Sequence, residues 1–164
     1  MATPTTLPAT FVAGNVLTAT QMNDLRGAFR ILQVVNGTTT TSTTSSTNTY
    51  VDTTLTATIT PSSTSSKILV LANQSGLLKQ TNNTAILLRL MRGATEISKF
   101  SRALHTADNS TIANATASVC YLDSPATTSA TTYKTQFQST DNLAVITVQW
   151  DGAMSTITLL EVSA

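Results

Sequence analysis

The chain has 164 residues, of which 41% are hydrophobic and only 10% are charged, and nine Lys and Arg against eight Asp and Glu leave a formal net charge of +1. This near-neutral balance provides no basic surface for nucleic acid, and the length suits a single domain with one core. The 35 threonines and 17 serines make up about a third of the chain, so hydroxyl groups take the place of charges on the predicted surface.

Residues 1–17 are predicted to form an extended arm, because Pro4 and Pro8 keep the residues before them out of helical conformations. The arm has no basic segment followed by an apolar one, so we expect no secretory signal and synthesis in a cytoplasm. The apolar runs of the whole chain are far shorter than the roughly 18 residues that a transmembrane helix needs. No membrane span is therefore expected.

A single short helix is predicted over residues 18–30. Thr18 and Gln21 have the spacing of an N-terminal capping box, and an apolar stripe follows at intervals of three and four residues. So short a helix is not stable alone and must dock, either on its own domain or on a neighbouring subunit or partner. Residues 1–30 would be anchored on a partner by the apolar side chains Phe11, Val16, Leu17, Met22, Leu25 and Phe29.

After residue 30 the pattern changes to alternating apolar and hydroxyl side chains, as between Val51 and Ile59. This period of two predicts strands, and the separators contain Gly, Pro, Asp and Asn. The prediction is an all-β, antiparallel, jelly-roll-like sandwich of eight or nine strands over residues 31–164, preceded by the arm and the helix. Strands are expected at about 30–37, 49–60, 67–78, 84–92, 95–101, 114–122, 131–139, 143–150 and 155–163.

Two of the connections are informative. Residues 38–49 are almost entirely Thr and Ser, which predicts either a solvated loop or an irregular edge strand. Asp151 and Gly152 follow an apolar strand, and Asp-Gly is a strong signal for a two-residue hairpin turn between that strand and the next.

The sequence contains no convincing catalytic constellation. Its glycines are too scattered for a phosphate-binding loop, and one His with one Cys cannot supply a usual metal-ligand set. His105 and Asp108 lie in a polar segment predicted to be a loop, and Cys120 lies in the apolar run 117–121, where a buried, inert thiol is expected. We therefore expect no enzyme activity, no cofactor and no metal.

Two charged residues, Arg89 and Glu161, interrupt apolar strands. An unpaired buried charge is too costly to keep, so each should reach water at the rim or form an ion pair, within the chain or between subunits. The strands at 84–91 and 157–162 are apolar on both faces, whereas a lone sandwich buries only one face of each strand. The second apolar face indicates an interface between copies of the chain.

Two stretches carry more information than composition does. The segment 11–23 (FVAGNVLTATQMN) resembles a segment that begins many virion proteins of tailed bacteriophages, often fibre or appendage components. Residues 59–61, 65–70, 88–93, 122–125 and 155–161 together look like a β-sandwich domain that recurs in phage virion proteins.

The resemblance implies a structural component of a phage particle, located in the virion as a fibre, tail appendage or capsid-surface protein. It also implies a homotrimeric β-knob attached to other virion proteins through residues 1–30. Because the helix leads almost directly into the sandwich, a short fibre, a decoration protein or an adaptor is favoured over a long fibre.

The alternative is a glycan-binding receptor module of a phage fibre, with host-surface glycan as its partner and its site in loops between strands. Such a site requires exposed aromatic side chains for sugar stacking. Most of the aromatic residues with a polar atom are instead expected in the core or an interface, because they lie at strand positions; they are Tyr50, Tyr121, Tyr133 and Trp150.

Overall fold

A computed structural model describes residues 31–80, 84–103 and 113–163 together with Val16, Thr18 and Ala19. In these residues the chain forms ten strands and one short 3-10 turn. The strands are β1 (Ile31–Thr39), β2 (Thr43–Ser45), β3 (Val51–Ile59), β4 (Lys67–Lys79), β5 (Ile86–Arg92), β6 (Thr95–Ala103), β7 (Ala113–Asp123), β8 (Thr131–Ser139), β9 (Ile146–Val148) and β10 (Ser155–Val162), and the turn is η1 (Trp150–Gly152).

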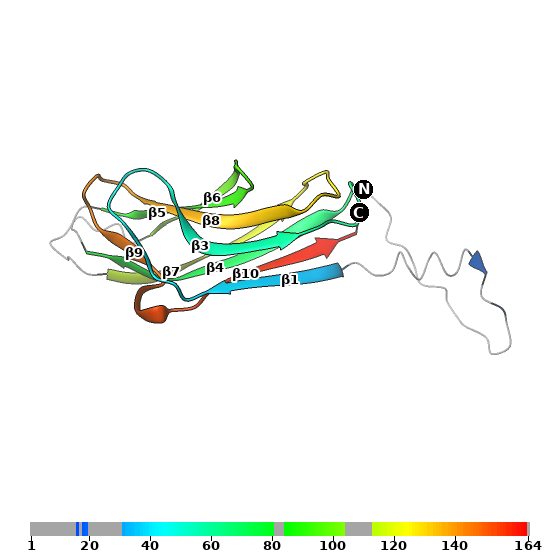
Figure 1. Cartoon of the computed structure of the whole chain (residues 1–164), viewed down its shortest axis with the longest axis horizontal. Helices are drawn as coiled ribbons and strands as arrows, with labels where there is room; N and C mark the ends of the chain where they lie inside the picture. Colours follow the sequence, from blue (N-terminus) through cyan, green and yellow to red (C-terminus); the bar gives the residue numbers. More distant parts are fainter. Residues whose placement is uncertain (1–15, 17, 20–30, 81–83, 104–112, 164) are drawn as a thin grey trace.

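The strands form two antiparallel sheets that pack face to face (Figure 1). The four-stranded sheet has the order β3-β8-β5-β6. The six-stranded sheet has the order β1-β10-β4-β9-β2, with β7 also paired to β4. The prediction of an all-β antiparallel sandwich is therefore confirmed. Within the described ranges, no helix has the length and apolar character that crossing a bilayer demands.

The long strand β4 organises the six-stranded sheet. β7 pairs along one edge of β4 over almost its whole length. On the other edge, β10 pairs with Lys67 to Asn73 and β9 pairs with Leu78 and Lys79. β1 and β2 then pair with β10 and β9 respectively. Four strands thus lie side by side across the sheet if β1 with β2, and β10 with β9, are each counted as one interrupted strand.

The hairpin predicted at Asp151 and Gly152 is wrong, because β9 and β10 follow one another along β4 and do not pair with each other. Asp151 (φ 57°) and Gly152 (φ 70°) do have the left-handed backbone that an Asp-Gly hairpin turn requires. The chain uses this backbone for η1, which bulges out where the paired strands are interrupted. The strand predicted at 143–150 is correspondingly reduced to Ile146–Val148.

The other predicted strands agree with the structure to within two residues at each end. The segment 38–49 contains β2, which pairs with β9 at the edge of its sheet, so the edge-strand alternative is confirmed. The predicted arm and helix, residues 1–30, lie outside the described residues except for Val16, Thr18 and Ala19.

The core follows from the alternation of side chains along each strand. In β3, Thr53, Leu55, Ala57 and Ile59 are buried while the residues between them are exposed. The buried apolar side chains of both sheets form two clusters, one containing Leu55, Val70, Leu90 and Tyr133 and the other containing Leu77, Leu88, Phe137 and Ile146.

A buried polar layer separates the two apolar clusters. Along β8, Thr135 lies between Tyr133 of the first cluster and Phe137 of the second, and along β4, Gln74 lies between Ala72 and Leu77. The members of the polar layer are Thr53, Gln74, Thr135, Gln149 and Ser155, each fully buried.

Candidate functional site

The end of the sandwich at which β1 begins and β10 ends, the proximal end, contains the buried acid Glu161 (Figure 1). Its carboxylate accepts hydrogen bonds from the backbone N–H of Ser62 (2.7 Å), from Ser62 Oγ (2.6 Å) and from Gln33 Nε2 (2.6 Å). Although burial raises the pKa of Glu161, these hydrogen bonds and one from Ser66 lower it to about 2. In the described residues the side chain is fully buried and forms no ion pair within the chain, so an ion pair between subunits stays a prediction.

A second buried acid, Asp123, lies at the same end. It forms an ion pair with Arg92 Nη1 at 2.9 Å and accepts a hydrogen bond from the Tyr133 hydroxyl at 2.6 Å. Burial of Tyr133 and the neighbouring Asp123 carboxylate raise the pKa of that hydroxyl well above its ordinary value. Ile68 is opposite both Asp123 and Glu161 in the strand register, so the two acids flank one position of β4.

These contacts give a structural reason for the second set of sequence motifs. The Arg92–Asp123 pair joins segments 88–93 and 122–125, and the Ser62–Glu161 bonds join the β3–β4 connection to segment 155–161. Segments far apart in sequence therefore contact one another at the proximal end.

Arg89 lies on the outer face of the four-stranded sheet, where its guanidinium is 3.9 Å from the centre of the Tyr50 ring. It forms an ion pair with Glu96 at 2.9 Å and donates to Gln136 Oε1 at 2.8 and 2.6 Å. Arg89 and Glu161 are on different sheets and are not brought together. Since Arg89 has partners in its own chain, its pairing across subunits stays a prediction that these contacts do not require.

The same network continues across the sheet through Asp52, which accepts from Gln136 Nε2 at 2.7 Å and pairs with Lys134 at 2.9 Å. Burial raises the pKa of Asp52, but its hydrogen bonds from Lys134 and Gln136 outweigh burial and lower it below the ordinary value. The outer face of the four-stranded sheet is therefore a connected polar and charged surface.

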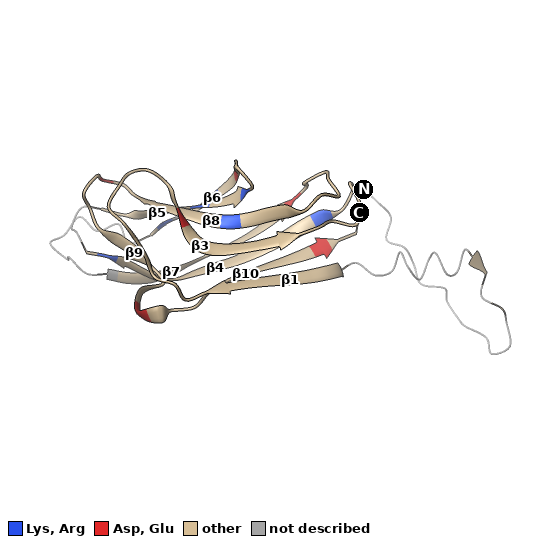
Figure 2. Cartoon of the chain, viewed as in Figure 1, with Lys and Arg blue, Asp and Glu red and all other residues tan. Residues whose placement is uncertain are grey.

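The outer face of the other sheet has a different character. A row of apolar register partners crosses this face from β1 through β10 and β4 to β7. We call it the apolar row, and it consists of Val34, Leu160, Leu69 and Leu122. Val34 is 58% exposed and Leu122 is 56% exposed. In Figure 2, β1 is uncharged along its whole length and β10 carries only the acidic position of Glu161. On β1 and β10 this outer face thus lacks the charges that cover the opposite one, while β4 contributes Lys67 at its beginning.

The next position along the same face contains Leu71, which is 40% exposed, and its register partner Cys120. Cys120 is exposed, so the prediction of a buried thiol is wrong. Residues alternate between faces of a strand, and the partly buried Val119 and Tyr121 pack against the core, so Cys120 between them points outward. Leu71 and Cys120 line a shallow groove of about 480 Å³ on this face.

The residues proposed from sequence as partner anchors mostly lie outside the described residues. This applies to all of them except Val16, whose side chain is 90% exposed. His105 and Asp108 also lie outside the described residues. Among the residues that are described, no group of three or more His, Cys, Asp and Glu side chains is placed to hold a metal ion.

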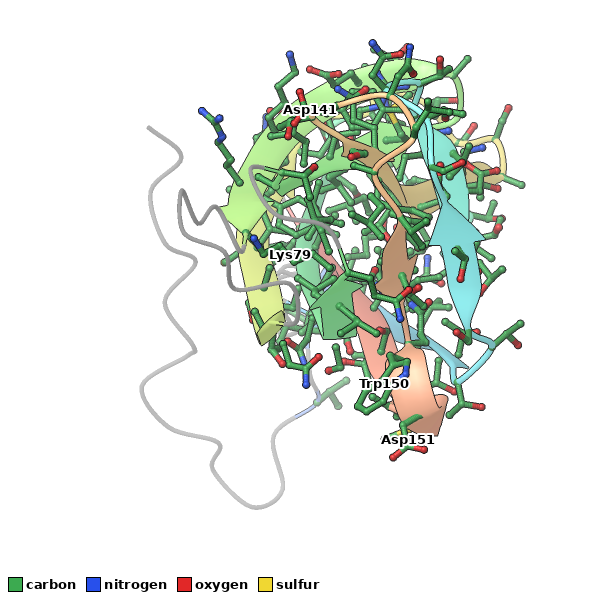
Figure 3. The ribbon with its side chains drawn as sticks, turned by 90° about the vertical axis from the view of Figure 1, so that its left-hand side faces the viewer. Lys79, Asp141, Trp150 and Asp151 are labelled. Atoms are coloured by element: carbon green, nitrogen blue, oxygen red, sulfur yellow. The ribbon has the colours of Figure 1, made fainter. Side chains whose placement is uncertain are left out.

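The remaining exposed feature is the turn η1. Trp150 is 46% exposed, so it does not lie in the core, whereas Tyr133 is fully buried and Tyr121 packs against the core. Figure 3 shows Trp150 and Asp151 side by side at one margin of the molecule, with Asp141 at the opposite margin. The predicted hairpin places Trp150 at the end of a strand, so this exposure is not evident from the sequence.

No protein-family model matches the chain, and no curated protein matches it. Function is therefore inferred from the two outer faces, the proximal end and the turn η1.

Proposed function

We propose that this chain is a non-enzymatic structural component of a tailed-bacteriophage particle, a short fibre, tail appendage or capsid-surface protein. Residues 1–30 anchor it to other virion proteins, and residues 31–164 form a homotrimeric knob. The resemblance of segment 11–23 to the beginnings of phage virion proteins supports the particle, and the second set of motifs supports the knob.

The strand order supports a jelly roll as the form of this knob. With β1 and β2 counted as one interrupted strand, and β9 and β10 as another, each sheet has four strand positions. Their order, β1/β2-β10/β9-β4-β7 against β3-β8-β5-β6, is that of an eight-stranded jelly roll, an architecture found in viral capsid domains.

The observation that carries the proposal is the apolar row on the outer face of the six-stranded sheet. Exposed apolar patches of this kind mark interaction surfaces. The row begins at Val34, three residues after Ile31, where the proposed anchoring segment joins the sandwich. A second copy fits this face because most of the outward residues beside the row are uncharged, including Asn36, Thr158 and Thr156. Lys67, the register partner of Val162, adds one positive charge beside the row.

Closed cyclic symmetry gives the apolar row of each copy a matching surface without producing open fibres. The choice of three copies comes from the resemblance, since phage fibre and decoration knobs are commonly trimeric. The charged outer face of the four-stranded sheet then remains in water.

The test of assembly is light scattering of the full chain during size-exclusion chromatography at micromolar concentration. We expect a mass close to three times the 17.2 kDa of the chain. The variant Leu122→Asp places a charge in the apolar row and should give monomers. The matched control Thr58→Asp places the same charge on an exposed position of β3, on the opposite outer face, and should leave the trimer intact.

A wild-type monomer under these conditions would contradict the trimer. The assignment of the chain to a phage particle is tested by mass spectrometry and cryo-electron microscopy of purified particles whose genome encodes this chain. The chain should be present in stoichiometric amounts, and a deletion of residues 1–28 should leave a folded knob that is absent from particles. Particles that lack the full-length chain would overturn the structural role.

A further inference from the structure

The turn around Trp150 has an unusual backbone. Gln149, Asp151 and Gly152 have φ values of 53°, 57° and 70°, in the left-handed region that side chains with a Cβ atom disfavour. Backbone of this kind persists only where the surroundings enforce it, and it clusters at ligand-binding sites. Two non-glycine residues in this region within one turn therefore make η1 a candidate site.

The turn is held in place by β4 beneath it. The backbone N–H of Gln149 donates to Ser75 O at 3.1 Å. Gly76 has φ 60° and lies so close that a Cβ atom there would be 2.6 Å from the backbone nitrogen of Trp150. The Gln149 side chain is fully buried in the polar layer, which fixes the start of the turn. Trp150 is thus presented by a rigid support and is preorganised for contact.

A shallow groove of about 410 Å³ has Trp150 among its lining residues. Three exposed polar side chains line it, and neither they nor the indole N–H form a side-chain hydrogen bond within the described part of the chain. The groove therefore combines one aromatic surface with donors and acceptors that are free for a ligand. Its lining residues are Gly76, Asn114, Ala115, Thr116, Trp150, Asp151 and Ala153.

We propose that this groove binds a sugar ring of a cell-surface glycan. One face of a pyranose consists of C–H groups and stacks on an indole, while its edge carries hydroxyl groups that need donors and acceptors. Trp150 supplies the stacking surface, the Asp151 carboxylate and the Asn114 carbonyl accept from hydroxyls, and the Asn114 amide donates to them.

The charge of the groove selects among sugars. Asp151 is the one ionisable side chain among the lining residues, so the groove carries a negative charge and no positive one. Neutral hexoses and N-acetylhexosamines are therefore expected to bind better than sialic or uronic acids, whose carboxylates Asp151 would repel. A single stacking surface gives weak binding, in the millimolar range for one sugar.

The site lies away from the proximal end, because η1 precedes the first residue of β10 whereas the proposed anchoring segment joins β1 beside the last one. The groove and the apolar row share one outer face, but Asn114 and Thr116 are six or more residues from Leu122 along β7. An attachment through residues 1–30 and an interface around the apolar row would thus both leave the groove accessible. Glycan binding is measured on the isolated full chain and requires no particle. The glycan site can therefore fail its test while the structural role stands, and the structural role can fail while the glycan site stands.

The chain itself provides the readout, because Trp150 is its only tryptophan. The full chain is first screened on an array of bacterial and eukaryotic glycans, and soluble fragments of the hits are titrated while tryptophan emission is recorded. We expect saturable quenching or a blue shift with neutral sugars, and at least tenfold weaker binding of N-acetylneuraminic acid and glucuronic acid.

Variants then locate the site by saturation-transfer NMR, which does not depend on the tryptophan. Trp150→Ala should abolish binding, Trp150→Phe should retain it in weakened form, and Asp151→Asn should reduce the discrimination against anionic sugars. Met154→Ala is the matched control, because Met154 is exposed nearby (57%) but does not line the groove, and it should bind as the wild type does.

No binding by the wild-type chain across the array would overturn the site, and so would undiminished binding by Trp150→Ala. Circular dichroism of each variant checks the fold. If Trp150→Ala does not fold, Trp150→Phe and Asp151→Asn decide the outcome, since wild-type affinity and selectivity in both would overturn the proposal.

Discussion

Thr135 on β8 donates a hydrogen bond to Gln74 Oε1 on β4, 2.9 Å away across the interior of the sandwich. The two residues belong to different sheets, so this bond crosses the core. Thr135 Oγ1 is also 2.5 Å from Thr53 Oγ1, and Gln74 Nε2 donates to Ser155 Oγ at 3.0 Å. The polar layer is therefore a continuous chain of hydrogen bonds from β3 through both sheets to β10.

Gln149 completes the polar layer. With its amide oriented so that both of its polar atoms have partners, it donates to the carbonyl oxygens of Thr41 and Thr53 and accepts from Gln74 Nε2 and Ser155 Oγ. Every buried polar side chain of the layer is thus satisfied, which is the condition under which a polar network in a core is tolerated.

Thr135→Val should destabilise the protein by about 1–3 kcal/mol, because it keeps the shape of the side chain but leaves Gln74 Oε1 buried without its donor. The measurement is chemical denaturation followed by circular dichroism. Thr58→Val removes a hydroxyl from an exposed position of β3 and should change stability by less than about 0.5 kcal/mol. Equal effects of the two substitutions would mean that the polar layer contributes no more than a surface hydroxyl does.

Glu161 makes stability depend on pH. Its pKa in the folded chain is about 2, below the ordinary value of 4.5, so its stabilising contribution is complete above pH 4.5 and is lost as the pH falls towards 2. A shift of this size corresponds to about 3 kcal/mol. Glu161→Gln should be less stable at pH 7 and should flatten the dependence of unfolding free energy on pH between 4.5 and 2.

The control for this experiment is Glu96→Gln, since Glu96 is one third exposed and its ion pair with Arg89 lies on an outer face. Such pairs contribute little to stability, so in Glu96→Gln the dependence of unfolding free energy on pH should stay near that of the wild type. A Glu161→Gln variant with an unchanged slope would show that the hydrogen bonds to this carboxylate do not favour its charged form.

Gly76→Ala should distort the turn η1. Gly76 has a positive φ, and a Cβ atom there would lie 2.6 Å from the Trp150 nitrogen and 2.8 Å from Ala153 Cβ. Gly93→Ala is the matched control, because Gly93 has a similar φ of 56° but no atom within 4 Å of the added Cβ. Gly93→Ala should lower the free energy of unfolding by about 1–2 kcal/mol, the cost of a left-handed backbone for a residue with a Cβ atom. Gly76→Ala should lower it further, because its Cβ atom also collides with η1.

The emission of Trp150 distinguishes distortion of η1 from the backbone cost that both variants share. The spectrum of the native chain should shift in Gly76→Ala and stay unchanged in Gly93→Ala. If both variants lost the same stability and kept the same spectrum, the close approach of η1 to β4 would have no energetic consequence.

Cys120 reports whether the outer face of the six-stranded sheet is covered. The thiol is exposed in the single chain, next to the apolar row, and the proposed trimer buries the part of this face around the row. At micromolar concentration the wild-type chain should therefore react slowly with Ellman's reagent, whereas Leu122→Asp should react at once. Denaturant should give one thiol per chain in both, and equally fast labelling of both native proteins would place the interface elsewhere.

The sequence by itself determined most of the strands and, where apolar and hydroxyl residues alternate, their two faces. The alternation of Thr with Val, Leu, Ala and Ile in β3 predicts which side chains are buried, because successive residues of a strand point to opposite sides. The Gly, Pro and Asp-containing separators placed most strand ends within two residues. These are local properties, so they can be derived without knowing which strands are neighbours.

Tertiary structure decided everything that depends on partners distant in sequence. The Asp151-Gly152 signal correctly indicated left-handed backbone, but only the pairing of both β9 and β10 with β4 turned it into a bulge that exposes Trp150. The run around Cys120 is apolar at nearly every position, so its pattern could not say which residues face inward. Thr135 and Gln74 are 61 residues apart, and their hydrogen bond exists because the packing of two sheets brings them together.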